Sequence, residues 1–152
     1  MIHTKSNSEI LKEFDKHVIG HTKAKKMLIS MVNRSKTAYY HKHGLMKPHH
    51  TIETMNCMLL GGSGTGKTHL VNTLQKIIPF PLIRLDSQML SPGDNSGGMG
   101  STKLKKLIVS NAKKIHKKYP LIYSSIEGTV DQTVVFIDEI DKICKREGAG
   151  SS

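Results

Sequence analysis

The chain alternates short, continuous apolar runs with longer segments whose apolar residues recur every three or four positions. Helical spacing predicts helices within residues 1–17, from Thr22 to about Gly44 and Pro48, from the Lys67 region to Pro79, and from Ser101 or Thr102 to before Pro120. Apolar runs predict strands at 55–60, 82–85 and 134–137. This order predicts an α/β fold with a parallel sheet between two helical layers, an α/β/α arrangement. In the second helix, the residues expected to face inward are Met27, Leu28, Met31 and Val32.

A glycine-rich loop follows the first predicted strand and leads into an amphipathic helix. It reads Gly61, Gly62, Ser63, Gly64, Thr65 and Gly66, and the helix opens with Lys67, Thr68 and His69. Glycine lets successive backbone N–H groups converge on phosphate oxygens at the positive end of a helix dipole. Lys67 would reach the β and γ phosphates, and the Thr68 hydroxyl would ligate Mg²⁺. Strand, loop and helix in this order predict a P-loop nucleotide-binding fold.

An acidic pair, Asp138-Glu139, follows the last predicted strand. At the carboxyl end of a parallel strand Asp138 would face Mg²⁺, directly or through waters, and Glu139 would polarise the water that attacks the γ-phosphate. A simple strand end that enters a charged helix is the structural alternative. Together with the phosphate loop, the pair predicts an ATPase with Lys67 and Glu139 as catalytic residues, and with ATP and Mg²⁺ bound.

Three segments of the sequence resemble the Clp-type AAA+ unfoldases of the ClpX and HslU group. They are Phe14 to Lys26, the phosphate loop, and Val135 to Arg146. The resemblance implies the large subdomain of an AAA+ module, with Val18 and Ile19 packing on adenine. It also implies an oligomer or an assembly with other AAA+ subunits, a protein substrate and a protease partner.

The sequence departs from that family in two places. The family's pore loop carries an aromatic residue between glycines, and the nearest counterpart here, Gly97 to Gly100, has Met99 without an aromatic neighbour. Family members also continue into two further strands that flank the phosphate-loop strand, a sensor residue, an arginine finger and a helical lid. We therefore expect a C-terminally incomplete module that a second chain completes, and slow intrinsic turnover.

Composition limits the class of protein further. No apolar run is long enough for a membrane span, and Met1 to Ser6 lacks the apolar stretch of a signal peptide, so we expect a cytoplasmic protein. The formal net charge is +11, and much of it lies on the lysine-rich helix after Ser101. Most such faces are merely solvated, but a basic surface can also gather nucleic acid or acidic partners by counterion release.

These observations leave three functions open. The first is an AAA+ ATPase of the Clp unfoldase type, and the second is a nucleotide-binding subunit without turnover of its own. The third is a P-loop ATPase associated with nucleic acid. We expect a partial nucleotide-binding domain over 1–147, which divides into an N-terminal helix at 1–17, an adenine-side segment and helix at 18–50, and the phosphate loop to the acidic motif at 51–147. A flexible tail at 148–152 would follow.

Overall fold

The computed structural model describes residues 5–45, 54–87 and 101–142. Within these ranges the chain forms two compact units, one up to Phe80 and one from Pro81 onward. The expected pore-loop counterpart at 97–100, Pro48 and the tail at 148–152 lie outside the described residues. Among those described, no helix is long and apolar enough to span a bilayer.

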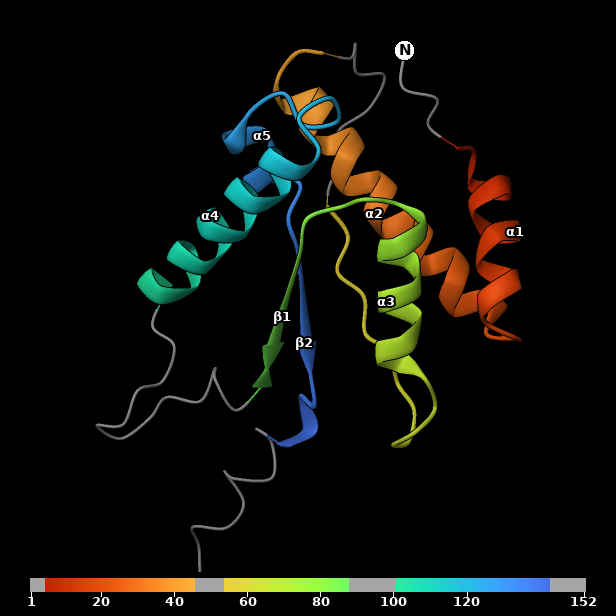
Figure 1. The fold of residues 1–152 in the computed structure, drawn as a ribbon. Helices are drawn as coiled ribbons and strands as arrows, with labels where there is room; N and C mark the ends of the chain where they lie inside the picture. The colour runs from red at the N-terminus through yellow and green to blue at the C-terminus, as the bar shows by residue number, and fades with distance from the viewer. Residues whose placement is uncertain (1–4, 46–53, 88–100, 143–152) are drawn as a thin grey trace, which may run out of the picture. The chain divides into compact units, whose positions relative to one another are not determined.

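The first unit is helical. It contains α1 (Asn7–His17), α2 (Thr22–Lys42) and α3 (Lys67–Ile77), and each of the three contacts the other two (Figure 1). Their shared core is built from apolar side chains that are at most 6% exposed: Ile10, Phe14, Leu28, Ile29, Val32, Leu70, Val71 and Leu74. The three helices predicted from the apolar spacing in this region are therefore confirmed.

Helix α1 begins at a capping box that the sequence spells out as Ser6-x-x-Glu9. The Ser6 hydroxyl accepts a hydrogen bond from the Glu9 backbone N–H at 3.3 Å, and the Ser6 N–H donates to the Glu9 carboxylate at 2.7 Å. Two donors of the first turn are satisfied in this way. The hydrogen bond from the Ser6 backbone lowers the pKa of Glu9, so the carboxylate stays charged at the positive end of the helix.

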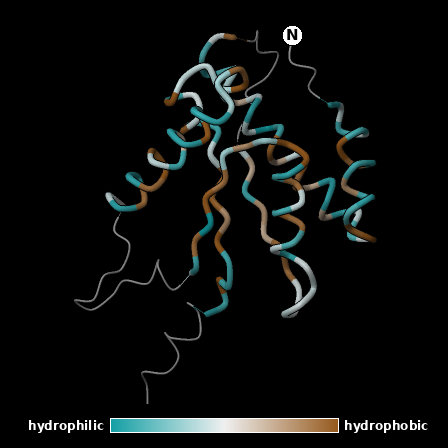
Figure 2. The backbone as a smooth tube through the Cα atoms, viewed as in Figure 1, coloured by the Kyte–Doolittle hydropathy of each residue, from teal (hydrophilic) through white to brown (hydrophobic). Residues whose placement is uncertain are grey.

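The second unit holds a parallel two-stranded sheet and two helices. Strand β1 (Leu82–Asp86) pairs with β2 (Val134–Asp138), and the register places Leu82 opposite Val134 and Asp86 opposite Asp138. The crossover between them contains α4 (Ser101–Lys118) and α5 (Ile126–Asp131), which contact each other. Figure 2 shows both strands as mainly hydrophobic and turning hydrophilic at their carboxyl ends. The sheet positions the acidic pair at that hydrophilic end.

The prediction of a strand at residues 55–60 was wrong, because the structure has no strand there. The segment keeps the alternation of a strand: Met55, Cys57 and Leu59 are half-buried, and the residues between them are exposed. A strand needs a neighbour to accept and donate its ladder hydrogen bonds, and β1 pairs only with β2 in the described sheet. The resemblance to the Clp group implies that this segment would pair with two further strands of the family's sheet, and neither β1 nor β2 is one of them.

Two smaller expectations also differ. Met27, expected to face inward, is 48% exposed, whereas Ile29, two positions further along α2, is 2% exposed. Strand β2 is only half-buried, with Ile137 39% exposed, although its sequence suggested a fully buried strand. Within the described residues β2 has a neighbour on one edge, so part of its apolar surface stays in water.

Replacing a core leucine of α3 should destabilise the first unit. Leu74 is 1% exposed, and Leu74→Ala is expected to lower the free energy of unfolding by about 2–5 kcal/mol because it leaves a cavity. Leu45, which is 65% exposed, provides the matched control, and Leu45→Ala should stay within about 0.5 kcal/mol of the wild type. Urea denaturation followed by circular dichroism measures both, and equal losses would contradict the assigned core.

Candidate nucleotide-binding site

The glycine-rich loop leads directly into the N-terminus of α3. Gly64 and Gly66 have φ angles of +78° and +82°, a left-handed conformation in which a side chain would be strained. A Cβ on Gly61 would lie 2.8 Å from the Thr65 hydroxyl, so a larger residue there would force the Thr65 side chain out of its hydrogen bond with the Gly62 carbonyl. The sequence folds in this way because glycine stands at each of these positions.

The start of α3 suits an anion. Gly66 is the N-cap residue, and no side chain caps the first turn of the helix. The first N–H groups of a helix lack intrahelical acceptors and sit at the positive end of its dipole. The first turn carries no acidic residue, and Ser63, Gly64 and Thr65 are exposed. The residues present therefore fit a phosphate group.

Lys67 lies over the same loop. Its Nζ donates hydrogen bonds to the carbonyl oxygens of Gly61 and Gly62, each at 2.8 Å. Thr65 also donates to the Gly62 carbonyl, at 2.9 Å. The two hydrogen bonds from Lys67 hold the ammonium group against the loop, and both are exposed to solvent. A phosphate that enters the loop can take over the ammonium as a charge-assisted partner.

The predicted adenine segment lies between α1 and α2 in this unit. Val18 is the C-cap residue of α1 and is 8% exposed, whereas the next residue, Ile19, is 96% exposed. Gly20 and His21 then turn the chain into α2 with φ angles of +73° and +55°. Val18 therefore packs in the core, and Ile19 presents an apolar side chain to solvent.

A buried lysine that sequence reasoning missed anchors this segment. Lys25 is 1% exposed, and its Nζ donates to Asp15 Oδ1 at 2.6 Å and to the Val18 carbonyl oxygen. The same ammonium lies 5.7 Å from the centroid of the Phe14 ring. Burying a charge is costly unless it is paired and hydrogen-bonded, so these contacts fix the end of α1 against α2. A lysine in a basic helix gave no signal that it would be buried.

The acidic half of the predicted site belongs to the second unit. Asp138 is the last residue of β2, and Glu139 follows it with a φ angle of +55°. The Asp138 carboxylate accepts a hydrogen bond from the Glu139 backbone N–H at 3.0 Å. A left-handed conformation is uncommon for a residue other than glycine, and such strain is concentrated at functional sites.

Ser87 holds the Glu139 backbone in this conformation. Its side chain is fully buried directly after β1, and its hydroxyl donates to the Glu139 carbonyl oxygen at 2.6 Å. The carboxylate of Glu139 pairs with Lys142, and this hydrogen bond raises the pKa of Lys142. Neither Ser87 nor Lys142 was predicted as a site residue from the sequence. The parallel register places Asp86 opposite Asp138, so the residues that follow them, Ser87 and Glu139, are also brought together.

A profile of the ATPase family associated with various cellular activities (AAA) matches residues 57–152. The chain belongs to the AAA family of ATPases. This match and the parallel α/β sheet confirm the P-loop fold class predicted from the sequence. The glycine-rich loop and the acidic pair both lie within the matched AAA region.

Curated relatives support the resemblance to the Clp group within the AAA family. The chain is 32% identical to the ATP-dependent Clp protease ATP-binding subunit ClpX 2 of Wolinella succinogenes, over 95% of this chain and 32% of that protein. It is 30% identical to ClpX of Bacteroides thetaiotaomicron over 91% of this chain and 30% of the relative. It is 33% identical to ClpX of Treponema denticola over 90% of this chain and 30% of that relative. The chain thus spans about a third of the length of these relatives.

Removing the charged neighbour of Lys25 should destabilise the α1–α2 junction. Asp15→Asn is expected to lower the free energy of unfolding by about 1–3 kcal/mol, because the buried ammonium loses its anionic acceptor while the outer half of the Asp15 side chain is solvated. Urea denaturation measures the loss.

Glu13→Gln is the matched control on the same helix. It removes a pair with Lys16, whose side chain is 66% exposed, and such surface pairs contribute about 0–1 kcal/mol. An equal loss in Asp15→Asn and Glu13→Gln would contradict the anchoring role of Lys25.

Proposed function

We propose that this chain binds ATP through the loop from Gly61 to Gly66 and the start of α3. The observation that carries the proposal is the helix start at Lys67, which has no side-chain cap and follows a glycine loop with two left-handed residues. Lys67 would pair with the β and γ phosphates, and backbone N–H groups up to His69 would surround them. Ile19 would meet the adenine ring, with Val18 holding the segment from its core side.

Magnesium would be held by the Thr68 hydroxyl and the Asp138 carboxylate. Both are hard oxygen donors, which Mg²⁺ prefers, and phosphate oxygens and waters complete such sites. The bound ion would neutralise negative charge on the phosphates. The family match supports ATP as the nucleotide, since the matched family is one of ATPases.

Glu139 would act as the residue that orients and polarises the attacking water. Its backbone is fixed on both sides, by the Asp138 carboxylate and by the Ser87 hydroxyl. Phosphoryl transfer depends mainly on positioning and charge stabilisation, so a rigid backbone at this residue favours the reaction. Lys142 would remain its ion-pair partner until the carboxylate turns to the water.

The relatives' names place them as ATP-binding subunits of an ATP-dependent protease. By this similarity we extend the proposal to an oligomeric, cytoplasmic assembly of AAA subunits that remodels protein substrates for a protease. A chain that binds ATP but needs another subunit for turnover is the second candidate. An arginine from a neighbouring subunit typically contributes about 10³–10⁵ in rate to such reactions.

Binding and turnover are separated by two substitutions. Lys67→Ala should weaken binding of a fluorescent ATP analogue by about 10–100-fold, because it removes a charged hydrogen bond to the phosphates. Glu139→Gln should keep the affinity and lower phosphate release by about 10²–10⁴-fold. Fluorescence titration and a steady-state phosphate assay with Mg²⁺ provide the measurements, with size-exclusion chromatography to define the assembly.

Each outcome has a distinct meaning. Binding that depends on Lys67, together with turnover that depends on Glu139, supports a self-sufficient ATPase. Binding without turnover supports the subunit that needs a further chain. Binding that is absent, or that is unchanged in Lys67→Ala, would overturn the nucleotide site.

Ser87 should influence turnover through Glu139. Ser87→Ala removes the hydrogen bond to the Glu139 carbonyl, so kcat is expected to fall by about 10-fold or more while the affinity for the ATP analogue stays unchanged. Ser110→Ala, at an exposed position of α4, is the control. Ser87→Thr, which retains a hydroxyl, should restore part of the rate. A proportional loss of affinity would instead indicate a purely structural role.

A further inference from the structure

Helix α4 carries a charged surface that the nucleotide site does not use. Its 18 residues include seven lysines and no acidic residue. At 3.6 residues per turn, six of these lysines fall within an arc of roughly 140°. We name this arc the lysine face, and its members, all exposed, are Lys103, Lys106, Lys113, Lys114, Lys117 and Lys118.

The opposite side of α4 is fixed within its own unit. Ala112 is fully buried, and Asn111 donates from Nδ2 to the Leu82 carbonyl of β1 at 3.3 Å. The ring of His116 forms a hydrogen bond of 2.8 Å between Nδ1 and the Tyr123 carbonyl oxygen. These contacts set the rotation of the helix, so the lysine face is directed to solvent.

The lysines of the N-terminal half are not explained by the helix dipole. Cations near a helix C-terminus interact favourably with the dipole, which accounts for Lys117 and Lys118. At the N-terminal end the same dipole disfavours Lys103, and Lys106, beyond the first turn, gains nothing from it. These two are also spaced three positions apart, where like charges repel each other on a helix.

No described residue forms an ion pair with the lysine face. The ion pairs found in the described ranges lie on α1, between α1 and α2, and at the end of β2. The repulsion along α4 is therefore compensated by water and counterions. An extended anion that binds this face would release those counterions into solution, and their release would contribute favourably to the free energy of binding.

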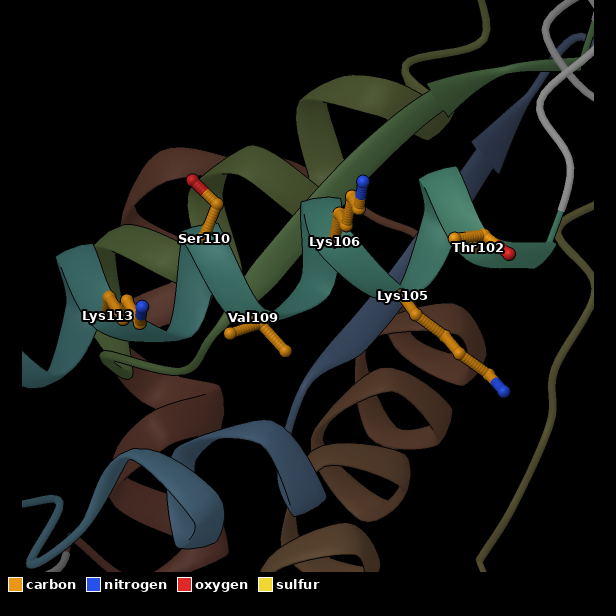
Figure 3. A pocket seen from close by; sticks show the side chains of 6 residues that line it. All are labelled: Thr102, Lys105, Lys106, Val109, Ser110 and Lys113. Carbon is orange, nitrogen blue, oxygen red and sulfur yellow. The ribbon is translucent and has the colours of Figure 1, made fainter.

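An open pocket borders the lysine face, and Figure 3 shows the six side chains that line it. The pocket is lined by Thr102, Lys105, Lys106, Val109, Ser110 and Lys113. In Figure 3 the side chains of Ser110 and Lys106 lie along one side of the helix, and those of Val109 and Lys105 along the other. Hydroxyl and ammonium groups, such as those of Ser110, Lys106 and Lys113, are donors that proteins use toward phosphate oxygens.

We propose that the lysine face of α4 binds the phosphate backbone of duplex nucleic acid without reading its sequence. The helix is about 27 Å long at 1.5 Å per residue, and a duplex carries one negative charge per about 1.7 Å of its axis. Stacking platforms for single strands use exposed aromatic side chains, and α4 contains no Phe, Tyr or Trp, while its one imidazole, His116, is hydrogen-bonded to the Tyr123 carbonyl. The face carries no Asn, Gln or Arg, and its flexible ammonium groups act on phosphates as point charges rather than as planar, bidentate donors.

The test measures the salt dependence of binding for the full chain in the absence of nucleotide. A fluorescein-labelled DNA duplex of about 20 base pairs is titrated by fluorescence anisotropy between about 50 and 200 mM KCl. The triple variant Lys106→Gln, Lys113→Gln, Lys117→Gln is expected to reduce the slope of log K against log salt by up to about 3. Its affinity should fall most at the low-salt end.

The control variant carries the same change of net charge elsewhere. Lys12→Gln, Lys23→Gln and Lys26→Gln replace exposed lysines of α1 and α2, and the slope should stay close to that of the wild type. Circular dichroism shows whether both triple variants keep their helix content. Where the α4 triple variant loses helix, Lys106→Gln and Lys113→Gln are tested singly, each with an expected slope change of about 1.

Several results would overturn the proposal. An equal change in both triple variants would show non-specific attraction to a basic protein. Tighter binding to a single strand, or full competition by poly-glutamate at equal charge, would assign the face to another anionic partner. Repeating the titration in Lys67→Ala separates this proposal from the nucleotide site, because duplex binding should persist there.

Discussion

The fixed start of α3 is the constraint on which the proposed nucleotide site depends. Leu70, Val71 and Leu74 are buried in the core of the first unit, so the helix axis cannot shift without loss of packing. The uncapped N-terminus is therefore held in place, and the preceding glycine loop must curve around it. Because Gly66 contributes no side chain, an anion can approach the first N–H groups directly.

The two predicted halves of the site achieve rigidity by different means. The loop uses glycine for its left-handed residues, whereas the acidic half places a glutamate in that conformation. A buried serine and the adjacent aspartate hold this backbone through hydrogen bonds. The fixed backbone limits the positions that the Glu139 carboxylate can take, which suits its proposed role of orienting water.

Local signals made most elements predictable, and tertiary contacts account for what was missed. The apolar spacing was sufficient to predict α1, and the apolar runs were sufficient to predict β1 and β2. The strand at 55–60 failed because a ladder depends on a neighbour that local sequence does not specify. Helix α5 was missed, although Ser125 caps it. The loop and acidic pair were found from their motifs, but burial of Lys25 and Ser87 follows only from packing.

The bond from Lys25 to Asp15 also bears on the order of folding. These residues lie 10 positions apart, whereas 52 positions separate Ser87 from Glu139. Closing a short loop loses less chain entropy and is faster than closing a long one. The α1–α2 pair can therefore assemble while the chain is still being synthesised, and the strand pairing that positions the acidic residues must wait until β2 has emerged.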